Sequence, residues 1–480
     1  FWANQSWRVK VMDIPEAVKA RLVDTAPADI SEIDLERHYK RSKRRGGLQL
    51  FPHQKEAVDA WLRNNMRGIF AMATGTGKTF AAFGCLDQTS RIHDRLLVVI
   101  SCPYQHLVQQ WKREIARFGI AYDALIVADS SNKRWRDMLA DALMDISLGR
   151  KNLVVAMTTH TTFRSDDFIA IVRDNKRGFR AMLVADEVHG VGAERSQAGL
   201  LDEYDFRLGL SATPRRWFDT GGTEAIYTFF GEEVFQFGLE EAIYTINPAT
   251  GQTYLVPYRY LPRFVSLDTD EVEDYAEKTR RIVRMANLSE RQEDATRHLD
   301  LLLFARANII KNAHEKYQAL DDVLDKQSLE KWKKIQWQGS EQIDEVMRIV
   351  NRRRLTAHRF TMAEGTIPTE QYGGLSEREG LLKRFGEGTY QILVAMKCLD
   401  EGVDVPPART AILMASSGNP REYIQRIGRV IRRHPGKTSA MIYDLVSLPP
   451  VGELPPEMRE IERGIIRKEL RRYREIAHTA

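Results

Sequence analysis

The segment Ile69–Thr79 constrains the fold of this chain more than any other part of the sequence. A short apolar run leads into a glycine-rich turn, and a helix is expected to begin after it. Gly75 and Gly77 permit a tight turn whose backbone N–H groups point at a phosphate. Lys78 can reach the β- and γ-phosphates of a nucleotide, and the Thr79 hydroxyl suits a Mg²⁺ ligand. The segment therefore predicts a phosphate-binding loop between a strand and a helix, and an ordinary glycine-rich turn is the less favoured alternative.

Composition places the chain among soluble globular proteins, and its 480 residues are enough for two to four domains. No apolar run approaches the roughly 18 residues of a membrane span. The three cysteines lie far apart, which favours a reducing, cytoplasmic environment over a disulfide framework or a zinc site. The net charge of +5 is too small to argue for nucleic acid by itself. Because the chain begins at Phe1 without a methionine, we expect it to continue a longer protein.

Residues 50–238 alternate short apolar runs with segments of helix length. Such runs are typical of the strands of a parallel sheet that is covered on both faces. The predicted strands are Ile69–Ala73, Leu96–Ile100, Leu125–Val127, Leu153–Met157, Ala181–Ala185 and Arg207–Leu210. Polar residues follow most of them, at Thr74, Ser101, Thr158, Asp186 and Ser211. Doubly wound sheets bind ligands at this edge, so we expect the site there.

Two adjacent acids, Asp186 and Glu187, follow one of these strands. A carboxylate at a strand end near a phosphate loop suits Mg²⁺ coordination, often through water. The neighbouring Glu187 can orient and deprotonate an attacking water. Adjacent acids can also simply cap a strand, but in combination with the phosphate loop they favour a site of nucleotide hydrolysis.

The rest of the chain divides by composition into further regions. Residues 1–49 form an N-terminal extension, with a charged helix at Ser31–Lys40 and a basic run to Arg45. Residues 239–345 read as a mostly helical connector, and residues 346–450 as a second α/β domain. Its predicted strands are Ile392–Met396, Ala411–Met414 and Ala440–Leu445. Residues 451–480 read as a basic C-terminal helix. The basic residues of both termini are more typical of a solvated face than of a DNA contact.

Three motifs together resemble those of a superfamily 2 helicase or translocase of the DEAD/DEAH type. They are Gly77-Lys78-Thr79, Asp186-Glu187-Val188-His189 and Ser211-Ala212-Thr213-Pro214. The resemblance extends over roughly residues 48–446, near the restriction-subunit and transcription-repair branches. Met72 stands where the general phosphate-loop pattern has a glycine, but Ala73–Thr79 has the form that helicases use. The resemblance implies two tandem RecA-like P-loop NTPase domains of the α/β class.

The resemblance also implies roles for residues around the first domain's site. Leu50–Gln54 resembles the adenine-reading Q motif, with Gln54 on the adenine edge and Phe51 where many relatives carry arginine. Thr74, Thr76 and the glycines of the loop would bind ATP. Pro103 with Leu107, Gln110 and Trp111 resembles motif Ia, and Thr159 falls where a DNA contact is expected. His189, Ser211 and Thr213 would couple the nucleotide state to the grip on DNA.

The second domain supplies two further motifs by resemblance. Leu399–Pro406 resembles motif V, which implies that Gly402 and Asp404 face the nucleotide. Asn419–Arg432 resembles motif VI, and Gln425 belongs to it. The spacing of Arg429 and Arg432 puts them about one helical turn apart, so both guanidiniums could clamp a γ-phosphate. An arginine-rich solvated helix is the less favoured alternative.

Two stretches do not fit this pattern. Motif IV should be an apolar strand before Gly339, but residues 332–338 are not strand-like, so the motif is either divergent or absent. His314, Lys316 and Asp321 match the spacing of phospholipase-D-type nucleases. That chemistry needs two such copies on strands, and this single copy falls in a helical stretch, so coincidence is the favoured explanation.

From the resemblance we expect an ATP-dependent DNA helicase or translocase that uses ATP and Mg²⁺. DNA is favoured over RNA, and relatives in restriction, phage-defence and repair systems suggest such a role, with effector domains or subunits outside this chain. The first alternative is an ATP-gated nucleic-acid clamp that switches an effector without processive unwinding. The second is a P-loop kinase, which needs neither a second RecA-like domain nor the paired arginines.

Overall fold

The computed structural model describes residues 49–216, 219–289, 293–325, 340–361, 364–365, 369–395, 405, 407–414, 420–448, 450, 459 and 463. They all lie in the compact unit Leu48–Ala480. Several expectations fall outside the described residues: the N-terminal extension with its charged helix and basic run, the motif IV stretch at 332–338, and Gly402 and Asp404 of motif V. The C-terminal helix at 451–480 also lies outside them, except for two single positions.

The first lobe is built on a seven-stranded sheet with the order β3-β4-β2-β5-β6-β1-β7, whose neighbouring strands all pair in parallel. The strands are β1 (Arg67–Met72), β2 (Leu96–Cys102), β3 (Ala124–Ala128), β4 (Leu153–Thr159), β5 (Arg180–Asp186), β6 (Phe206–Ser211) and β7 (Glu233–Phe237). All six predicted strands are present. The edge strand β7 escaped prediction because Glu233 and Gln236 interrupt its apolar residues, as a half-buried edge allows.

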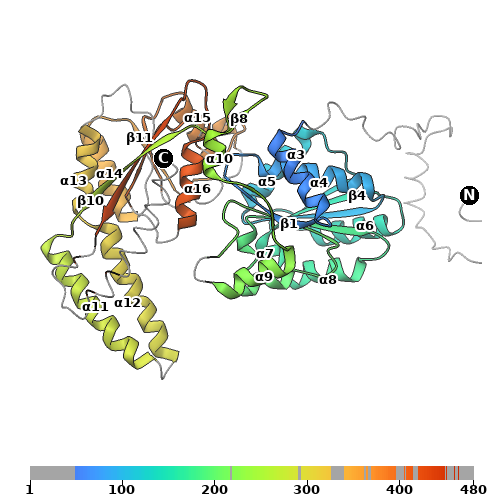
Figure 1. Cartoon of the computed structure of the whole chain (residues 1–480), viewed down its shortest axis with the longest axis horizontal. Coiled ribbons are helices and arrows are strands. Elements are labelled where there is room, and N and C mark those ends of the chain that lie inside the picture. The colour runs from blue at the N-terminus through green and yellow to red at the C-terminus, as the bar shows by residue number, and fades with distance from the viewer. Residues whose placement is uncertain are drawn as a thin grey trace, which may run out of the picture. The chain divides into compact units, whose positions relative to one another are not determined.

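Helices cover both faces of this sheet (Figure 1). Along β2, Leu96, Val98 and Ile100 join one hydrophobic cluster, whereas Leu97 and Val99 join another. The first cluster includes α3 (Pro52–Arg63), α4 (Lys78–Ile92) and α5 (Gln105–Phe118). The second includes α6 (Trp135–Ser147), α7 (His160–Phe163), α8 (Asp166–Asn175) and α9 (Thr220–Phe230). The continuous apolar strands are thus explained by burial on two sides, and the predicted α/β fold class is confirmed.

A connecting segment leads from the first lobe to the second. It contains α10 (Leu239–Tyr244) and a small antiparallel pair, β8 (Ile246–Asn247) and β9 (Gln252–Thr253). The next strand, β10 (Tyr258–Val265), pairs in parallel with β14 (Ala440–Ser447) along its whole length. The second lobe therefore takes a strand from the segment expected to be a mostly helical connector. This strand was missed because Arg259, Pro262 and Arg263 break its apolar pattern; an edge strand tolerates such residues.

The other described strands of the second lobe form two small sheets. Strand β13 (Thr410–Leu413) pairs with β14, and β11 (Ala357–Phe360) pairs with β12 (Ile392–Ala395), all in parallel. These strands match the predicted ones, with β11 added. The described helices of this half are α11 (Thr269–Ser289), α12 (Glu293–Asn312), α13 (Glu315–Asp325), α14 (Ser340–Arg352), α15 (Glu377–Gly386) and α16 (Pro420–Val430).

Two residues of the nuclease-like spacing, Lys316 and Asp321, lie in α13 and make structural contacts. The Lys316 ammonium is buried and donates to the carbonyl of Met414 at 2.7 Å. Asp321 accepts from Arg353 at 2.7 Å and pairs with it as an ion pair. Both side chains are thus engaged in packing the helix onto the second lobe. Among the described residues, no helix is long and apolar enough to cross a membrane.

Candidate functional site

The phosphate loop lies between β1 and α4, as the sequence predicts. Gly75 and Gly77 have φ values of 92° and 88°, in the left-handed region that favours glycine. A Cβ atom on Gly77 would lie only 2.2 Å from Nε2 of Gln54, so any other residue would displace that side chain. Gly77 is also the N-cap of α4, which leaves the first N–H groups of this 15-residue helix directed at the loop. The loop is therefore shaped to receive an anion.

Most side chains of the loop line a pocket, whereas that of Thr76 stabilises the turn. Thr74, Lys78 and Thr79 line the pocket together with Gly75 and Gly77. The Lys78 ammonium donates to the carbonyl of Met72 at 3.2 Å. The Thr74 hydroxyl is buried and has no hydrogen-bond partner among the described residues, so it is available to a ligand. Thr76 instead bonds the carbonyl of Ala73 at 2.8 Å and holds the turn.

The acidic pair lies at the end of β5 and faces the same pocket. Both oxygens of Asp186 are oriented: Oδ1 accepts from the backbone N–H of Glu187 at 3.0 Å, and Oδ2 from the indole of Trp111 at 2.9 Å. Burial, and then the charge of Glu187, raise the pKa of Asp186 above its usual value, while Trp111 and Lys78 oppose the shift. A bound cation would add to that opposition.

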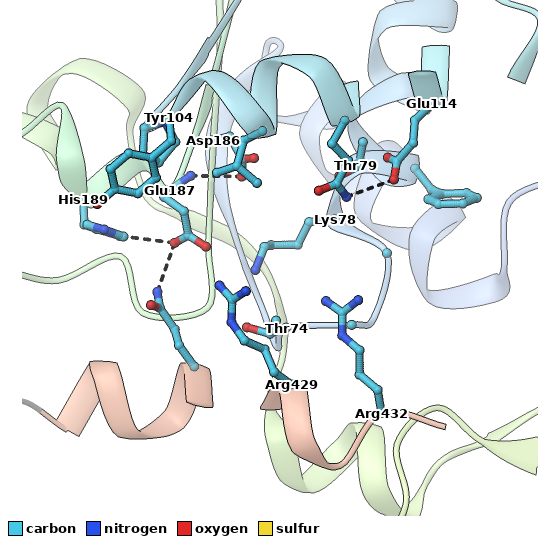
Figure 2. Close-up of a pocket in the computed structure, with 17 residues that line it drawn as sticks. Thr74, Lys78, Thr79, Tyr104, Glu114, Asp186, Glu187, His189, Arg429 and Arg432 are labelled. Atoms are coloured by element: carbon cyan, nitrogen blue, oxygen red, sulfur yellow. Dashed lines mark hydrogen bonds and ion pairs between the residues drawn. The ribbon is translucent and has the colours of Figure 1, made fainter. Parts of the chain in front are cut away.

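Glu187 occupies a backbone conformation that is uncommon for residues with a side chain. Its φ is 46°, in the left-handed region, which turns its side chain away from the strand and into the pocket. Its Oε2 atom lies 3.2 Å from the amide nitrogen of Gln425, 3.4 Å from the Ser211 hydroxyl and 3.4 Å from Nδ1 of His189. Figure 2 shows the contacts of Glu187 with His189 and with the helix of the second lobe. The carboxylate is thus held by residues of both lobes.

The second lobe contributes α16 to this pocket, together with Arg432, which lies two residues after the helix ends. Gln425, Arg429 and Arg432 line it, and Gln425 and Arg429 are each only 5% exposed. In Figure 2 the guanidiniums of Arg429 and Arg432 point toward the side of the pocket that carries Lys78. The helix approaches the loop closely at Gly428, where a Cβ atom would lie 3.1 Å from that of Thr74. The absence of a side chain at this position therefore allows the two arginines to reach the phosphate loop.

The end of α16 is fixed to the segment that connects the lobes. The N–H of Val256 donates to the carbonyl of Ile431 at 2.9 Å, and Leu255 forms an antiparallel bridge with Arg432. Arg433 donates to Gln252 at 2.9 Å and also to the carbonyl and hydroxyl of Thr253. The segment before β10 thus runs alongside the arginine pair and sets its position.

Several predicted residues lie beside the pocket rather than in it. Gln54 is 1% exposed; its amide donates to the carbonyls of Thr76 and Gly77 at 3.3 Å, so in this structure it braces the loop. Thr159 accepts from the N–H of Thr162 and caps α7. The N–H of Thr213 donates to Ser211, which in turn reaches Glu187. Pro103, in contrast, lines the pocket itself.

The pocket also contains residues that were not predicted as site residues. They are Phe80, Tyr104 and Glu114. Leu107 and Gln110, which belong to the stretch resembling motif Ia, also line the pocket. Gln110 donates to Glu114 at 3.0 Å. Glu114 lies four residues after Gln110 on the same face of α5, so the resemblance to motif Ia could have revealed it.

The pocket suits a Mg²⁺ ion that is held mainly by a nucleotide. Thr79 and Asp186 supply a hydroxyl and a carboxylate oxygen, which are ligands that Mg²⁺ prefers. The described residues contain no cluster of three or more acidic, histidine or cysteine side chains that would form a complete protein cage. Such a cage is not needed, since Mg²⁺ commonly takes one or two protein ligands plus phosphate oxygens and waters.

Two protein-family models match the chain. Residues 47–216 match the type III restriction enzyme res subunit, and residues 315–434 match the helicase conserved C-terminal domain. The first match includes the phosphate loop and the acidic pair, and the second includes α16 with both arginines.

Curated relatives resemble the chain over most of its length. A DNA 3′-5′ translocase XPB2 of Sulfurisphaera tokodaii is 28% identical over 406 residues, which cover 80% of this chain and 79% of that protein. A protein of Halobacterium salinarum described as a DNA 3′-5′ helicase Rad25 is 27% identical. The match covers 82% of this chain and 54% of that protein. The chain thus spans about half the length of the Rad25 relative.

Two solved structures share the fold at low sequence identity. The ATP-dependent Type ISP restriction-modification enzyme LlaBIII bound to DNA has a TM-score of 0.55 and 16% identity, covering 85% of this chain and 28% of that chain. The Pyrococcus furiosus Hef helicase domain has a TM-score of 0.50 and 15% identity, covering 82% and 95%. These matches agree with two RecA-like domains in tandem.

Proposed function

Because the chain belongs to superfamily 2 of the helicases, in the branch of the restriction subunits and XPB-like proteins, we propose that it is an ATP-dependent DNA translocase or helicase. One observation carries this proposal. Lys78, Asp186 and Glu187 of the first lobe share a single pocket with Arg429 and Arg432 of the second. A triphosphate between these groups would link the two lobes, and its hydrolysis would change the distance between them.

The residues that line the pocket would have separate roles in ATP hydrolysis. Lys78, the Thr74 hydroxyl and the N–H groups at the start of α4 would bind the β- and γ-phosphates. Thr79 and Asp186 would hold Mg²⁺, which supplies charge neutralisation at the phosphates when bound. Glu187 would orient the attacking water and accept its proton. Arg429 and Arg432 would stabilise the charge that spreads over the transferred phosphoryl oxygens, a contribution of ~10³–10⁵ in rate for an arginine of this kind.

The contacts of Glu187 provide the coupling between chemistry and movement. Gln425 of the second lobe and Ser211 and His189 of the first all reach the same carboxylate oxygen. An attacking water, which would donate a hydrogen bond to Glu187, would have to compete with Gln425 for this carboxylate. We therefore expect the lobes to rearrange as nucleotide binds, and the DNA contacts of each lobe to alternate with that rearrangement.

The test is to measure ATP hydrolysis with single-stranded, duplex and forked DNA and with RNA, followed by strand displacement and triplex displacement. The proposal expects stimulation by DNA above that by RNA, and displacement that requires ATP. Stimulation without either kind of displacement would favour the ATP-gated clamp, whose pocket would be the same. Hydrolysis that no nucleic acid stimulates would contradict both. A role in restriction, phage defence or repair, with further subunits, rests on the branch of the family alone.

A further inference from the structure

Trp111 belongs to the stretch that resembles motif Ia, a resemblance that gives it no role in hydrolysis, yet its side chain contacts the acidic pair directly. It lies on α5 and is 2% exposed, with its ring edge-on to Phe83 of α4 at 5.2 Å between ring centroids. An indole N–H can only donate, and when buried it needs an acceptor. The acceptor here is Oδ2 of Asp186, at 2.9 Å.

This hydrogen bond fixes the direction of the carboxylate. Oδ1 of Asp186 is held by the N–H of Glu187, and Oδ2 by Trp111, so neither oxygen can rotate without losing a donor. Each oxygen keeps a second lone pair that can face the pocket. The ring itself is held by α4, the helix that starts with Lys78 and Thr79. The same side chain thus contacts both the helix that follows the phosphate loop and the carboxylate across from it.

We infer that Trp111 is a positioning residue, which orients Asp186 for the Mg²⁺ of a bound nucleotide and carries the position of α5 to that carboxylate. This inference rests on the proposed function. Residues that hold a metal ligand in its orientation typically change metal affinity 10–100-fold when they are lost. Since α5 begins directly after Pro103 and Tyr104 at the edge of the sheet, a shift of that segment would reach Asp186 through Trp111.

The test variant is Trp111→Phe, which keeps an aromatic ring against Phe83 but removes the N–H. The matched control is Trp61→Phe. Trp61 is also fully buried, and its N–H also donates a single bond, but to the backbone carbonyl of Arg207 at 3.0 Å. The two variants therefore lose the same chemical group from the same first lobe, and only one loses it from Asp186.

The measurement is the affinity for a fluorescent ADP analogue in EDTA and across a titration of Mg²⁺. For Trp111→Phe we expect the Mg²⁺ half-saturation to rise about 10-fold, with the affinity in EDTA and the value in Trp61→Phe both within about twofold of wild type. An unchanged half-saturation, or an equal rise in both variants, would overturn the inference and leave the proposed function standing. Failure of the wild type to bind the analogue at all would instead contradict the proposed function.

If Trp111→Phe does not fold, 3-benzothienylalanine at position 111 keeps the ring shape and replaces only the N–H by sulfur. The same rise in Mg²⁺ half-saturation is expected with this residue. A half-saturation equal to that of wild type would again overturn the inference.

Discussion

The two lobes hold their parts of the site in different ways. In the first lobe, Lys78, Asp186 and Glu187 follow strands of one continuous seven-stranded sheet, and Asp186 is held by hydrogen bonds from within the lobe. In the second, the described strands form sheets of three and two. The arginines come from the C-terminal end of α16, with Arg429 in its last turn and Arg432 two residues after it. That end is anchored mainly by the connecting segment. We infer that the first lobe is a preformed nucleotide-binding site. The second lobe brings the catalytic arginines, Arg429 and Arg432, to that site by moving.

The largest loss should follow from changes in the preformed site. Lys78→Ala removes the charge at the phosphates, and Glu187→Gln removes the base while keeping the size of the side chain. Each should abolish DNA-stimulated ATP hydrolysis, and loss of the base in Glu187→Gln should by itself lower the rate by about 10²–10⁴-fold. Steady-state phosphate release measures this. Near-normal turnover in both variants would refute the assignment of the site.

A change in the arginine pair should separate the binding of ATP from its hydrolysis. Arg432→Ala should leave the affinity for ATP almost unchanged and lower the hydrolysis rate by ~10³–10⁵-fold, since the guanidinium acts on charge that develops during phosphoryl transfer. Nucleotide titration and single-turnover hydrolysis give the two quantities. An equal loss of nucleotide affinity would point to a folding defect and not to a missing catalytic group.

Losing the contacts that hold the end of α16 should lower the hydrolysis rate less than losing Arg432 itself. Arg433→Ala removes the bonds to Gln252 and Thr253, so the end of α16 would no longer be held in register with the phosphate loop. A displacement of about 1 Å costs on the order of 10²-fold in rate, and we expect kcat to fall by that amount with little change in KM. Gln252→Ala, which removes one of these bonds, should have a smaller effect. If Arg433→Ala keeps full kcat, the connecting segment does not position the arginines.

The smallest effect concerns the stability of the first lobe at low pH. Burial lowers the pKa of His160 to about 4, from an ordinary value of 6.5; its ring contacts the carbonyl of Asp186 at 3.1 Å. Between these two values the unfolded chain binds more protons than the folded one, so stability falls as pH decreases through this window. The loss from pH 7 to pH 5 should be about 2 kcal/mol.

Urea unfolding midpoints at the two pH values measure this effect. In His160→Asn the free energy of unfolding should depend less on pH than in wild type. Some dependence should remain in both proteins, because burial also lowers the pKa of His53. An identical pH dependence in the two proteins would show that His160 is not the group responsible.

Local sequence chemistry predicted the first lobe more completely than the second. Continuous apolar runs identified β1 to β6 because these strands are buried on both faces, and Gly75, Gly77 and the acidic pair carry their own chemical signature. The edge strands β7 and β10 were missed because polar residues interrupt their apolar runs, whereas the edge strand β3 has an uninterrupted run and was predicted. Contacts between distant segments cannot be read from spacing. The bond from Trp111 to Asp186 and the one from Gln425 to Glu187 join residues far apart in the chain.

The central claim is that one triphosphate is held by Lys78 and the acids of the first lobe and by the paired arginines of the second. Its most direct test is a structure of the chain with ADP, Mg²⁺ and aluminium fluoride, which mimics the transferred phosphoryl group. The account predicts that the guanidiniums of Arg429 and Arg432 both contact the fluoride, with Glu187 facing the attacking water. Guanidiniums that point away from the fluoride in a closed complex would contradict it.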